Sequence, residues 1–483
     1  MDNDLTSIQE ARDLANAAHT AQLSWAKASQ EQVDRVCAAM AEAAYQASER
    51  LGCAACEETG YGIPAHKKLK NEFGSRSVWE SIKNVKTVGV VGQDPTRRIY
   101  EIAWPVGVVA ALTPSTNPTS TAMFKVLISV KARNGIVIAP HPSAARCTYE
   151  TARVMADAAV AAGAPPGLIG CFQNVSLQGT QELMNHKYTA LILATGGSAM
   201  VKAAHSVGKP AYGVGPGNVP AYVDRSADLE RAARYIVSSK AFDCSTICAT
   251  EQAVIADRPI AARLAELMQV NGAYFVDENQ AETLRKTLFA ADGSINPQTV
   301  GKSPQVLAGL AGIQVPDTAR ILVARLNSVG KDEPLSREKL TTVLGWYEAD
   351  GWEAGCERSI ELILFGGRGH TQIIHANDEK IIMAFGLEKP VFRILVNTMG
   401  TLGAIGFTTG VMPSLTLGAG GIGGSITGDN VTVFHMFNIK RLAYETTSPP
   451  DLVFNPVDKT PGIAAEEIER MVRSVLQEYM KQS

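Results

Sequence analysis

A cysteine in a turn of small residues is the side chain best suited to covalent chemistry. Cys248 lies in SSKAFDCSTICATEQAVIAD, residues 238–257, directly before an apolar run that predicts a strand. A thiolate is a strong nucleophile and can attack an aldehyde carbon to give a thiohemiacetal. Loss of hydride to a nicotinamide would then leave a thioester on the sulfur. The cysteine alone does not specify this chemistry, because most buried cysteines serve only packing.

The remaining cysteines indicate reduced thiols. The eight cysteines are scattered through 483 residues, which argues against a disulfide framework. Cys53 and Cys56 form a C-x-x-C pair, but they lie in the helix-like ASERLGCAACEETG with no second pair at zinc-finger spacing. We therefore expect packing side chains there and no metal site.

Composition narrows the classes of function. Hydrophobic residues make up 46% of the chain, charged residues 19%, and the formal net charge is −3. These values are typical of a soluble globular protein and give no reason to expect nucleic-acid binding. No run of about 18 uncharged apolar residues predicts a membrane span. The acidic start MDNDLTSIQEARDL lacks a signal-peptide pattern, so the expected location is the cytoplasm.

The first half of the chain predicts a parallel sheet covered by helices. Residues 5–58 indicate two helices, and 97–115 favour strands. Apolar runs then alternate with helical segments. The predicted strand–helix pairs are 106–112 with 120–133, 135–140 with 147–161, 168–172 with 178–185, and 189–195 with a helix from Ser198. This alternation indicates an α/β, Rossmann-like fold that binds its ligand at the carboxyl ends of the strands.

A second α/β stretch begins near Lys240. Its predicted strands are 250–256, 321–326, 341–347, 371–376 and 391–397. The glycine-rich GAGGIGGSITG of 418–428 predicts a loop, since glycine is costly inside regular structure.

The end of the chain differs from the rest. Residues 448–462 are rich in proline and predict an extended linker. Residues 463–483 repeat apolar side chains at the spacing of one helix face. A helix this short is marginal alone in water, so we expect it to dock on a partner.

These segments give the expected domain organisation. Residues 1–240 would form N-terminal helices and an NAD-binding domain, with an oligomerisation strand near 97–104. Residues 241–430 would form a catalytic domain, and 431–447 would return to the cofactor domain and its oligomerisation strands. The linker of 448–462 and the helix of 463–483 would follow. Because exposed strands need partners, a homodimer or homotetramer is expected.

Several segments in series give the chain a family resemblance. FDCSTICATEQAVI, residues 242–255, resembles the active-site stretch of CoA-acylating aldehyde dehydrogenases, and further matching segments run in order from about residue 100 to 445. The chain resembles the aldehyde dehydrogenase half of bifunctional aldehyde-alcohol dehydrogenases. It also resembles the enzymes of propionaldehyde, acetaldehyde and sulfoacetaldehyde metabolism. The resemblance implies the aldehyde dehydrogenase fold, with a Rossmann-like cofactor domain and an α/β catalytic domain with oligomerisation strands.

The resemblance also implies roles for single residues. Cys248 would be the nucleophile, and Cys244, where the family often has Asn, a passive neighbour. The Asn117 amide and the Cys248 backbone N–H would hold the oxyanion that forms on attack. His370 would steer or deprotonate an incoming thiol, and a structural role for it is equally open.

Cofactor and substrate contacts are implied in the same way. NAD, or NADP, would contact Thr113, Pro114, His141, Pro142, Thr195, Gly196, Gly197, Ser198, Gly215, Glu338 and Leu340. Pro413, Ser414 and Leu415 would shape the aldehyde pocket. Scarce basic residues in these loops favour an uncharged aldehyde, but the sequence does not fix which one.

One loop favours a thiol over water as the acyl acceptor. The segment from Tyr212 to Pro220 contains no carboxylate, whereas hydrolytic members of the family keep a glutamate base there. Without that base, water attack on a thioester should be slow, and the thiol of coenzyme A becomes the expected acceptor. The expected reaction is reversible and converts aldehyde, NAD and CoA to acyl-CoA and NADH. The alternatives are a hydrolytic enzyme that makes the free acid, and a non-catalytic microcompartment assembly protein.

The terminal helix suggests a macromolecular partner. After its proline-rich linker it resembles the encapsulation peptides that load enzymes into bacterial microcompartments, where an apolar helix face docks in a groove. A shell or cargo protein would then be the partner of 463–483. The alternative is an ordinary terminal helix that packs on its own enzyme or on a sister subunit.

Overall fold

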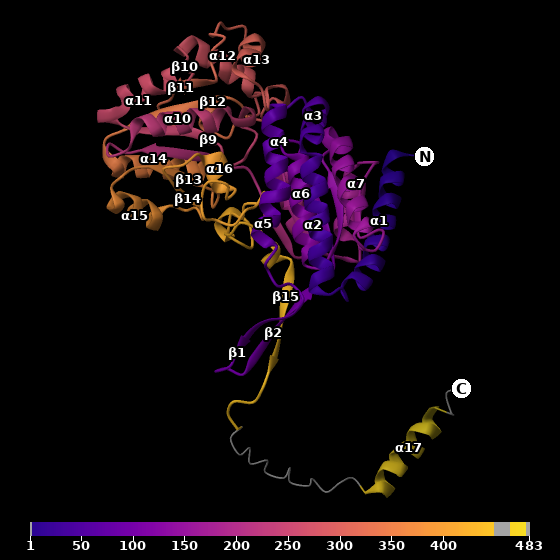
Figure 1. Cartoon of the computed structure of the whole chain (residues 1–483). Helices are drawn as coiled ribbons and strands as arrows, with labels where there is room; N and C mark the ends of the chain where they lie inside the picture. Colours follow the sequence, from indigo (N-terminus) through magenta and orange to yellow (C-terminus); the bar gives the residue numbers. More distant parts are fainter. Residues whose placement is uncertain (1, 449–463, 480–483) are drawn as a thin grey trace. The chain divides into compact units, whose positions relative to one another are not determined.

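The computed structural model describes residues 2–448 and 464–479. Over these ranges the chain forms sheets of three, seven and five strands (Figure 1). One compact unit comprises residues 1–91 and 102–440, and a second comprises 92–101 and 441–483. Apart from Ser448, the expected linker of 448–462 lies outside the described residues.

The five-stranded sheet is parallel, and helices cover both of its faces. Because successive strand residues point to opposite faces, Val108 and Ala110 pack toward α1 and α8, and Val109 and Ala111 pack toward α6. The strand order is β5 (Ile169–Cys171), β4 (Gly135–Pro140), β3 (Val108–Thr113), β6 (Thr189–Thr195), β7 (Ala211–Val214). The helices are α1 (Asn3–Trp25), α6 (Pro118–Lys131), α7 (Ala145–Ala161), α8 (Leu177–Asn185) and α9 (Ser198–Ser206).

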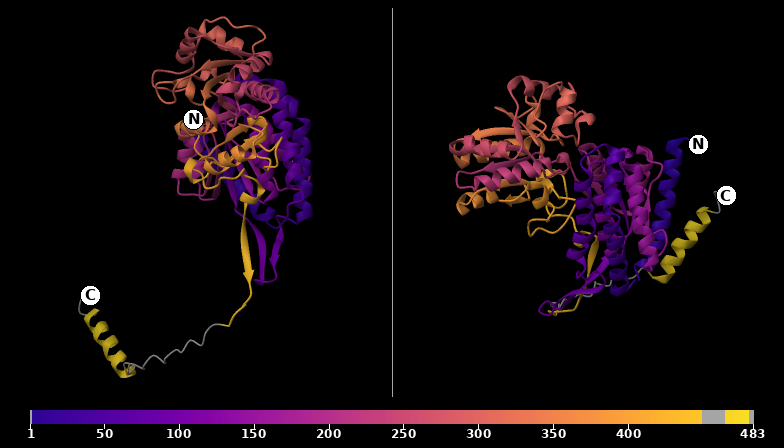
Figure 2. Two further views of the ribbon diagram at one scale, coloured as in Figure 1. Left: turned by 90° about the vertical axis from the view of Figure 1, so that its left-hand side faces the viewer. Right: turned by 45° about the horizontal axis from the view of Figure 1, so that its top comes forward.

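The seven-stranded sheet is also parallel and covered on both faces, as the two views of Figure 2 show. Its order is β10 (Ala273–Phe275), β11 (Ile321–Arg325), β12 (Val343–Ala349), β9 (Glu251–Asp257), β8 (Val219–Val223), β13 (Gln372–His375), β14 (Ile394–Val396). Its helices are α10 (Leu229–Ala241), α11 (Arg258–Val270), α12 (Glu278–Leu288), α13 (Pro304–Ala311), α14 (Gly351–Gly366), α15 (Glu379–Glu388) and α16 (Gly400–Ala404).

This α/β architecture confirms the predicted fold class, with two differences in detail. The strands expected from 106 to 195 and from 250 to 397 are present, but β7, β8 and β10 were not predicted. β7 and β8 flank the turn-forming GVGPGN, and β10 has only three residues. Because β8 pairs with β9, the second sheet begins at Val219, before the expected boundary at Lys240.

The prediction of two helices over 5–58 is wrong, because three form there. They are α1, α2 (Gln30–Gln46) and α3 (Ser48–Thr59), and α4 (Pro64–Glu72), a π-turn at Phe73–Ser77 and α5 (Val78–Ile82) follow. A capping box between Ser29 and Gln32 starts α2. Only Ala47 separates α2 from α3, so the apolar pattern runs on and does not mark the break.

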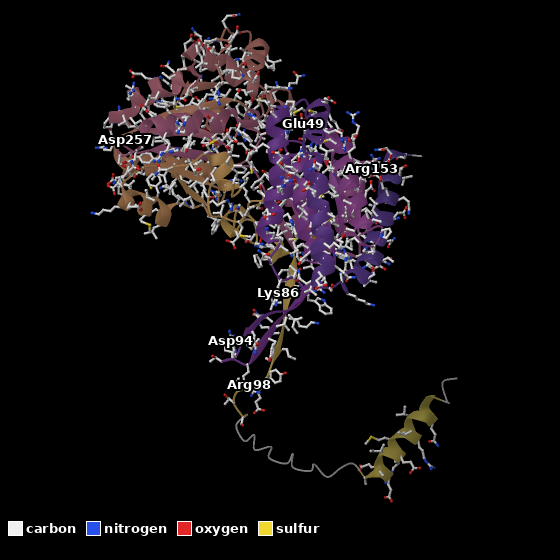
Figure 3. The ribbon with its side chains drawn as sticks, viewed as in Figure 1. Glu49, Lys86, Asp94, Arg98, Arg153 and Asp257 are labelled. Atoms are coloured by element: carbon white, nitrogen blue, oxygen red, sulfur yellow. The ribbon has the colours of Figure 1, made fainter. Side chains whose placement is uncertain are left out.

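The three-stranded sheet has the order β1 (Gly89–Asp94), β2 (Ile99–Pro105), β15 (Phe437–Ala443). A strand is therefore present where 97–104 was expected, and its part in oligomerisation stays a prediction. Arg98, directly before β2, bonds to the residues that follow β15. Its carbonyl accepts from the Tyr444 N–H at 3.1 Å, and its guanidinium donates to the Glu445 carbonyl at 2.8 Å. Figure 3 labels Arg98 together with Asp94.

The expected terminal helix is present as α17 (Ala465–Tyr479). Ile468, Met471, Val472 and Val475 on this helix are all at least half exposed. Across the described part of the chain, none of the helices combines the length and apolar character that a membrane crossing requires.

The packing of α8 on α1 gives a test of the fold. A Cβ on Gly179 of α8 would lie 1.9 Å from Ser7 Oγ and 2.9 Å from the Ser7 carbonyl oxygen, whereas a Cβ on Gly309 of α13 would meet nothing within 4 Å. Gly179→Ala should destabilise the protein by about 1–3 kcal/mol through overpacking. Gly309→Ala should stabilise it by about 0.5–1 kcal/mol through helix propensity. Thermal and urea unfolding of the two variants check this, and shifts of the same sign would contradict it.

Candidate active site

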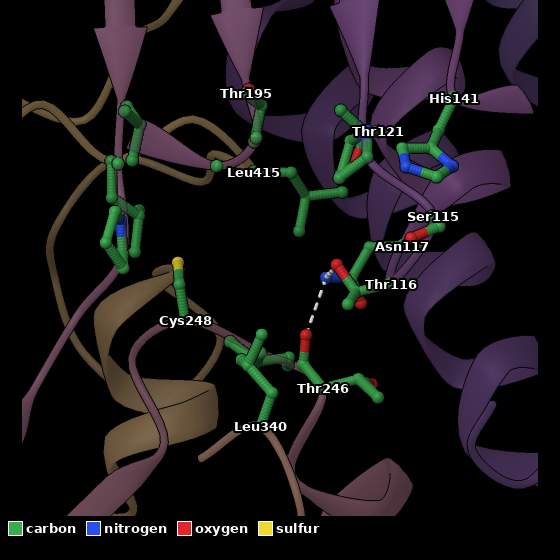
Figure 4. A pocket seen from close by; sticks show the side chains of 18 of the residues that line it. Ser115, Thr116, Asn117, Thr121, His141, Thr195, Thr246, Cys248, Leu340 and Leu415 are labelled. Carbon is green, nitrogen blue, oxygen red and sulfur yellow. Dashed lines mark hydrogen bonds between the residues drawn. The ribbon is translucent and has the colours of Figure 1, made fainter. Parts of the chain in front are cut away.

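A cavity lies at the carboxyl ends of the five-stranded sheet, where it meets the loop before β9 (Figure 4). Residues that follow β3, β4, β6 and β7 line one side, and Thr246, Ile247 and Cys248 line the other. Leu415 and Leu417 add apolar surface. Open parallel sheets bind ligands at this edge, so the cavity is where the sequence places the cofactor.

The loop before the cavity presents Cys248. Asp243, Cys244 and Ser245 have φ of 48°, 50° and 68°, a left-handed conformation that non-glycine residues rarely adopt. Figure 4 shows the Cys248 side chain projecting into the cavity, with Asn117 and Leu415 around the same space. Burial, followed by the carboxylate of Glu338, raises the pKa of the Cys248 thiol to about 12. The cavity therefore holds a protonated thiol at neutral pH.

Asn117 lies between the cavity and a buried lysine. Its Nδ2 donates to the Thr246 carbonyl at 2.9 Å and to Thr116 Oγ1 at 3.2 Å, and its Oδ1 accepts from Lys70 Nζ. Asn117 is also the N-cap residue of α6, so positive partial charge from that helix terminus lies beside it. The amide is thus set in an environment that favours negative charge in the cavity.

Glu338 is the one carboxylate among the described residues that line the cavity. Its Oε1 accepts from the Gly217 N–H at 3.0 Å, and burial raises its pKa to about 7. Gly217 packs closely on the backbone of Cys248, since an added Cβ would lie 2.3 Å from the Cys248 carbonyl oxygen and 3.0 Å from His370 Nδ1.

The comparisons with known proteins agree with this geometry. The protein-family model described as "Aldehyde dehydrogenase family" matches residues 4–275 of this chain. The chain belongs to the aldehyde dehydrogenase family. This result confirms the family resemblance of the sequence.

Three relatives of this aldehyde dehydrogenase illustrate the range of similarity. It is 42% identical over 442 residues to aldehyde-alcohol dehydrogenase 2 of Entamoeba histolytica, a match that covers 88% of this chain and 51% of that protein. The chain thus spans about half the length of the aldehyde-alcohol dehydrogenases that it matches. An acetylating aldehyde dehydrogenase from Geobacillus thermoglucosidasius is 50% identical with a TM-score of 0.92, covering 93% of this chain and 99% of that one. A propionaldehyde dehydrogenase from the fucose utilisation microcompartment of Clostridium phytofermentans is 27% identical with a TM-score of 0.82, covering 90% and 97%.

The cavity brings together most of the site residues expected in this aldehyde dehydrogenase. They are Pro114, Asn117, His141, Thr195, Gly196, Gly197, Gly215, Cys248, Glu338, Leu340 and Leu415. The segment after β6 also fits a pyrophosphate. Gly197 is the N-cap of α9, whose first backbone N–H groups have no partner within the helix, and a Cβ on Gly197 or Gly215 would meet nothing within 4 Å, so a ligand has room at this helix terminus.

The other expected site residues lie outside the cavity lining. Ser198 lines a neighbouring pocket with Lys202 and Arg368, and Thr113, Pro142 and Pro413 line neither. Ser414 is fully buried: its hydroxyl donates to the Val431 carbonyl at 2.7 Å and accepts from the Thr416 N–H, so it orders the loop that carries Leu415.

His370 lies behind Gly217 and outside the cavity lining. It is buried, with Nδ1 3.0 Å from Thr371 Oγ1, and among the described residues Nε2 has no hydrogen-bond partner. Burial, and then the charge of Arg393, lowers the pKa of His370 to about 3, so the imidazole is neutral at physiological pH.

Sequence reasoning missed the buried charges beneath the site. Lys67 and Lys70 both form ion pairs with Asp243, and Lys70 also donates to Asn117. The sequence does hold a signal, because Lys67 and Lys70 lie three residues apart and so share one helix face. It gives no sign that this face is buried.

Replacing Glu338 should change the reactivity of Cys248. At about pH 8 Glu338 is mostly ionised, and its negative charge disfavours the thiolate, so Glu338→Gln should lower the Cys248 pKa. Alkylation of Cys248 by iodoacetamide should accelerate by roughly threefold to tenfold, which corresponds to about half to one pKa unit. Mass spectrometry of the Cys248 peptide measures the rate. Glu353→Gln, at an exposed position on α14, is the control. An unchanged or slower alkylation rate in Glu338→Gln would show that the Glu338 carboxylate does not raise the pKa of Cys248.

Proposed function

We propose that this chain is a CoA-acylating aldehyde dehydrogenase that interconverts an aldehyde and its acyl-CoA with NAD or NADP. One observation carries the proposal: Cys248 and Asn117 face the same cavity at the carboxyl edge of the five-stranded sheet, and the 212–220 loop beside them has no carboxylate. Similarity to the acetylating enzyme from Geobacillus thermoglucosidasius supports it.

The residues divide the reaction into two half-reactions. Cys248 attacks the aldehyde carbon, and the Asn117 amide with the Cys248 N–H holds the oxygen that becomes negative. A nicotinamide, which the residues around Gly196, Gly197 and Glu338 would hold, would supply the hydride acceptor, so that loss of hydride and of the hydroxyl proton would leave a thioester on Cys248. The CoA thiol then attacks the thioester carbon, and Cys248 departs as a thiolate. Both half-reactions are reversible, so the chain also reduces acyl-CoA.

Glu338 is the group that could support hydrolysis instead. Its pKa of about 7 suits a general base, but its Oε1 already accepts from Gly217. We assign Glu338 to the nicotinamide ribose, as the family resemblance implies. His370 is buried behind Gly217 with a pKa of about 3, too low for a base that deprotonates a thiol, so of its two expected roles we propose the structural one, in the packing of Gly217 against Cys248. Uncharged short aldehydes are the proposed substrates.

For the terminal helix we propose a role in assembly. Four apolar side chains of α17 are exposed on the spacing of one face, at 468, 471, 472 and 475. Such a face suits helix-in-groove docking on a microcompartment shell or cargo protein. The similarity to the Clostridium phytofermentans enzyme supports that setting. A homodimer or homotetramer that pairs the strands of the three-stranded sheet completes the proposed assembly.

Coenzyme A dependence is the direct test of the activity. Reduction of NAD by short aldehydes should require CoA and should yield acyl-CoA, because water lacks a base in the 212–220 loop. Absorbance of reduced nicotinamide, with and without CoA, measures this. Cys248→Ala should abolish turnover, and Cys244→Ala, a neighbour that does not line the cavity, should retain it. Equal rates without CoA would mean that water completes the cycle.

Removal of 448–483 tests the role of the helix. The truncated enzyme should keep its kcat, because none of the described residues of this segment, 448 and 464–479, lines the cavity. It should fail to co-sediment with assembled shell protein, whereas the full chain does. A truncated enzyme that loses activity, or that still binds the shell, would count against the assembly role.

A further inference from the structure

Three buried charged side chains join α4 to the loop that presents Cys248. Lys67 and Lys70 lie on α4, Asp243 lies in the loop, and their side chains are at most 2% exposed. Lys67 Nζ lies 3.0 Å from Asp243 Oδ2, and Lys70 Nζ pairs with the same oxygen. Burial lowers the pKa of Lys70 to about 8, so Lys70 is mostly protonated at pH 7, and the two ammonium groups then share one carboxylate, which leaves a net positive charge under the active site.

The rest of the Asp243 carboxylate is also bonded. Its Oδ1 accepts from the Ile63 N–H at 2.7 Å, and its Oδ2 accepts from Thr246 Oγ1 at 2.6 Å. The Asp243 N–H donates to His66 Nδ1 at 2.8 Å. The approach is so close that a Cβ on Gly62 would lie 2.1 Å from Asp243 Oδ1. The loop is thereby fixed to the N-terminal end of α4.

The same lysines hold the other side of the cavity. Lys67 Nζ donates to the Thr116 carbonyl at 2.9 Å, and Lys70 Nζ donates to Asn117 Oδ1. An ammonium group can only donate, so it selects the orientation in which Oδ1 faces Lys70 and Nδ2 faces Thr246 and the cavity. Donation from an ammonium also polarises the amide and strengthens its N–H groups as donors.

Stabilisation of the fold alone does not explain why these three charged side chains are buried together. Burying ions is costly, and a buried ion cluster is weak support for stability, since apolar side chains of similar volume often stabilise as well or better. Here the cluster contacts both halves of the reaction centre, namely Asn117 and the loop of Cys248.

We propose that Lys70, with Lys67 and Asp243, forms a positioning cluster that orients the Asn117 amide toward the substrate oxygen and fixes its place relative to Cys248. The inference rests on the proposed function, because it assigns Asn117 to the oxyanion. The 3.2 Å contact of Asn117 Nδ2 to Thr116 Oγ1 is the longer of its two donations, and the substrate oxygen takes its place.

Lys70→Met removes the charge and keeps most of the volume. Its kcat should fall by roughly 10²–10³-fold, the range for losing one oxyanion donor, while the KM for NAD changes little. Lys131→Met is the matched control. Lys131 is a buried lysine paired with Asp34 at the far end of α6, so its loss should lower the melting temperature and leave kcat unchanged. Equal kcat in wild type and Lys70→Met would overturn the inference.

A double variant separates positioning from general damage. If Lys70 acts through Asn117, then Asn117→Ala with Lys70→Met should be no slower than Asn117→Ala alone. Losses that multiply would contradict the inference. If Lys70→Met does not fold, Lys70→Arg serves instead, because it keeps the charge but cannot set its donors where Nζ lies. A lower kcat at constant KM supports the inference there, and an unchanged kcat overturns it.

Chemical rescue adds a readout that a folding defect would not move. Lys70→Ala lacks the atoms of propylamine, so propylammonium should restore kcat several-fold and propanol should not. Restoration by both, or by neither in a folded variant, would refute the role of the charge. Wild-type enzyme in the same assay distinguishes the two proposals. If the wild type shows no CoA-dependent reduction of NAD, the proposed function is wrong. If the wild type is active and the Lys70 variants do not behave as expected, only the positioning cluster is wrong.

Discussion

Presentation of Cys248 depends on one carboxylate that offsets a strained backbone. Each left-handed residue costs about 1–2 kcal/mol, and Asp243, Cys244 and Ser245 are left-handed in succession. The Asp243 side chain accepts from the Ile63 N–H, from the Thr246 hydroxyl and from two ammonium groups. Much of the energy of these charged hydrogen bonds offsets the cost of burying the ions, and what they supply to the loop is a fixed attachment to Ile63 and α4. The conformation therefore persists only while α4 is docked against it.

Burial away from water decides which groups around the cavity are charged. Burial is the largest cause of the raised pKa of Cys248, to about 12, and of Glu338, to about 7, and of the lowered pKa of His370, to about 3. Each shift favours the neutral form. Positive charge lies instead on the Asn117 side, at the lysines that share Asp243, where burial lowers the pKa of Lys70 only to about 8. Attack by sulfur transfers negative charge to the carbonyl oxygen, and in this arrangement that charge develops beside the cations and the α6 N-terminus.

The sequence predicts the site through its local patterns, and what it misses is non-local. Apolar runs before helices locate β3, β4, β6 and β9. The carboxyl ends of β3, β4 and β6 bring Asn117, His141 and Gly197 to one cavity, and the loop before β9 brings Cys248. Family resemblance assigns Ser414 to the pocket because it adjoins Leu415, but its hydroxyl is used by Val431 and Thr416. Lys70 and Asp243 are 173 residues apart, and nothing in either local sequence indicates that they pair. Likewise, β8 joins the second sheet through pairing with β9, which no local pattern reveals.

Packing explains why the loop between β7 and β8 cannot easily carry a base for hydrolysis. Gly217 fits against the Cys248 carbonyl and His370 so closely that any side chain there would displace the nucleophile's backbone. Pro216 lines the cavity, and a Cβ on Gly215 would meet nothing within 4 Å, on the side of the proposed pyrophosphate site at Gly197. A carboxylate at 215 would put negative charge beside those phosphates. The absence of a base is therefore tied to how the loop packs and to the charge of the proposed cofactor. A thiol ionises far more readily than water, so it suits an acyl transfer that has no base in this loop.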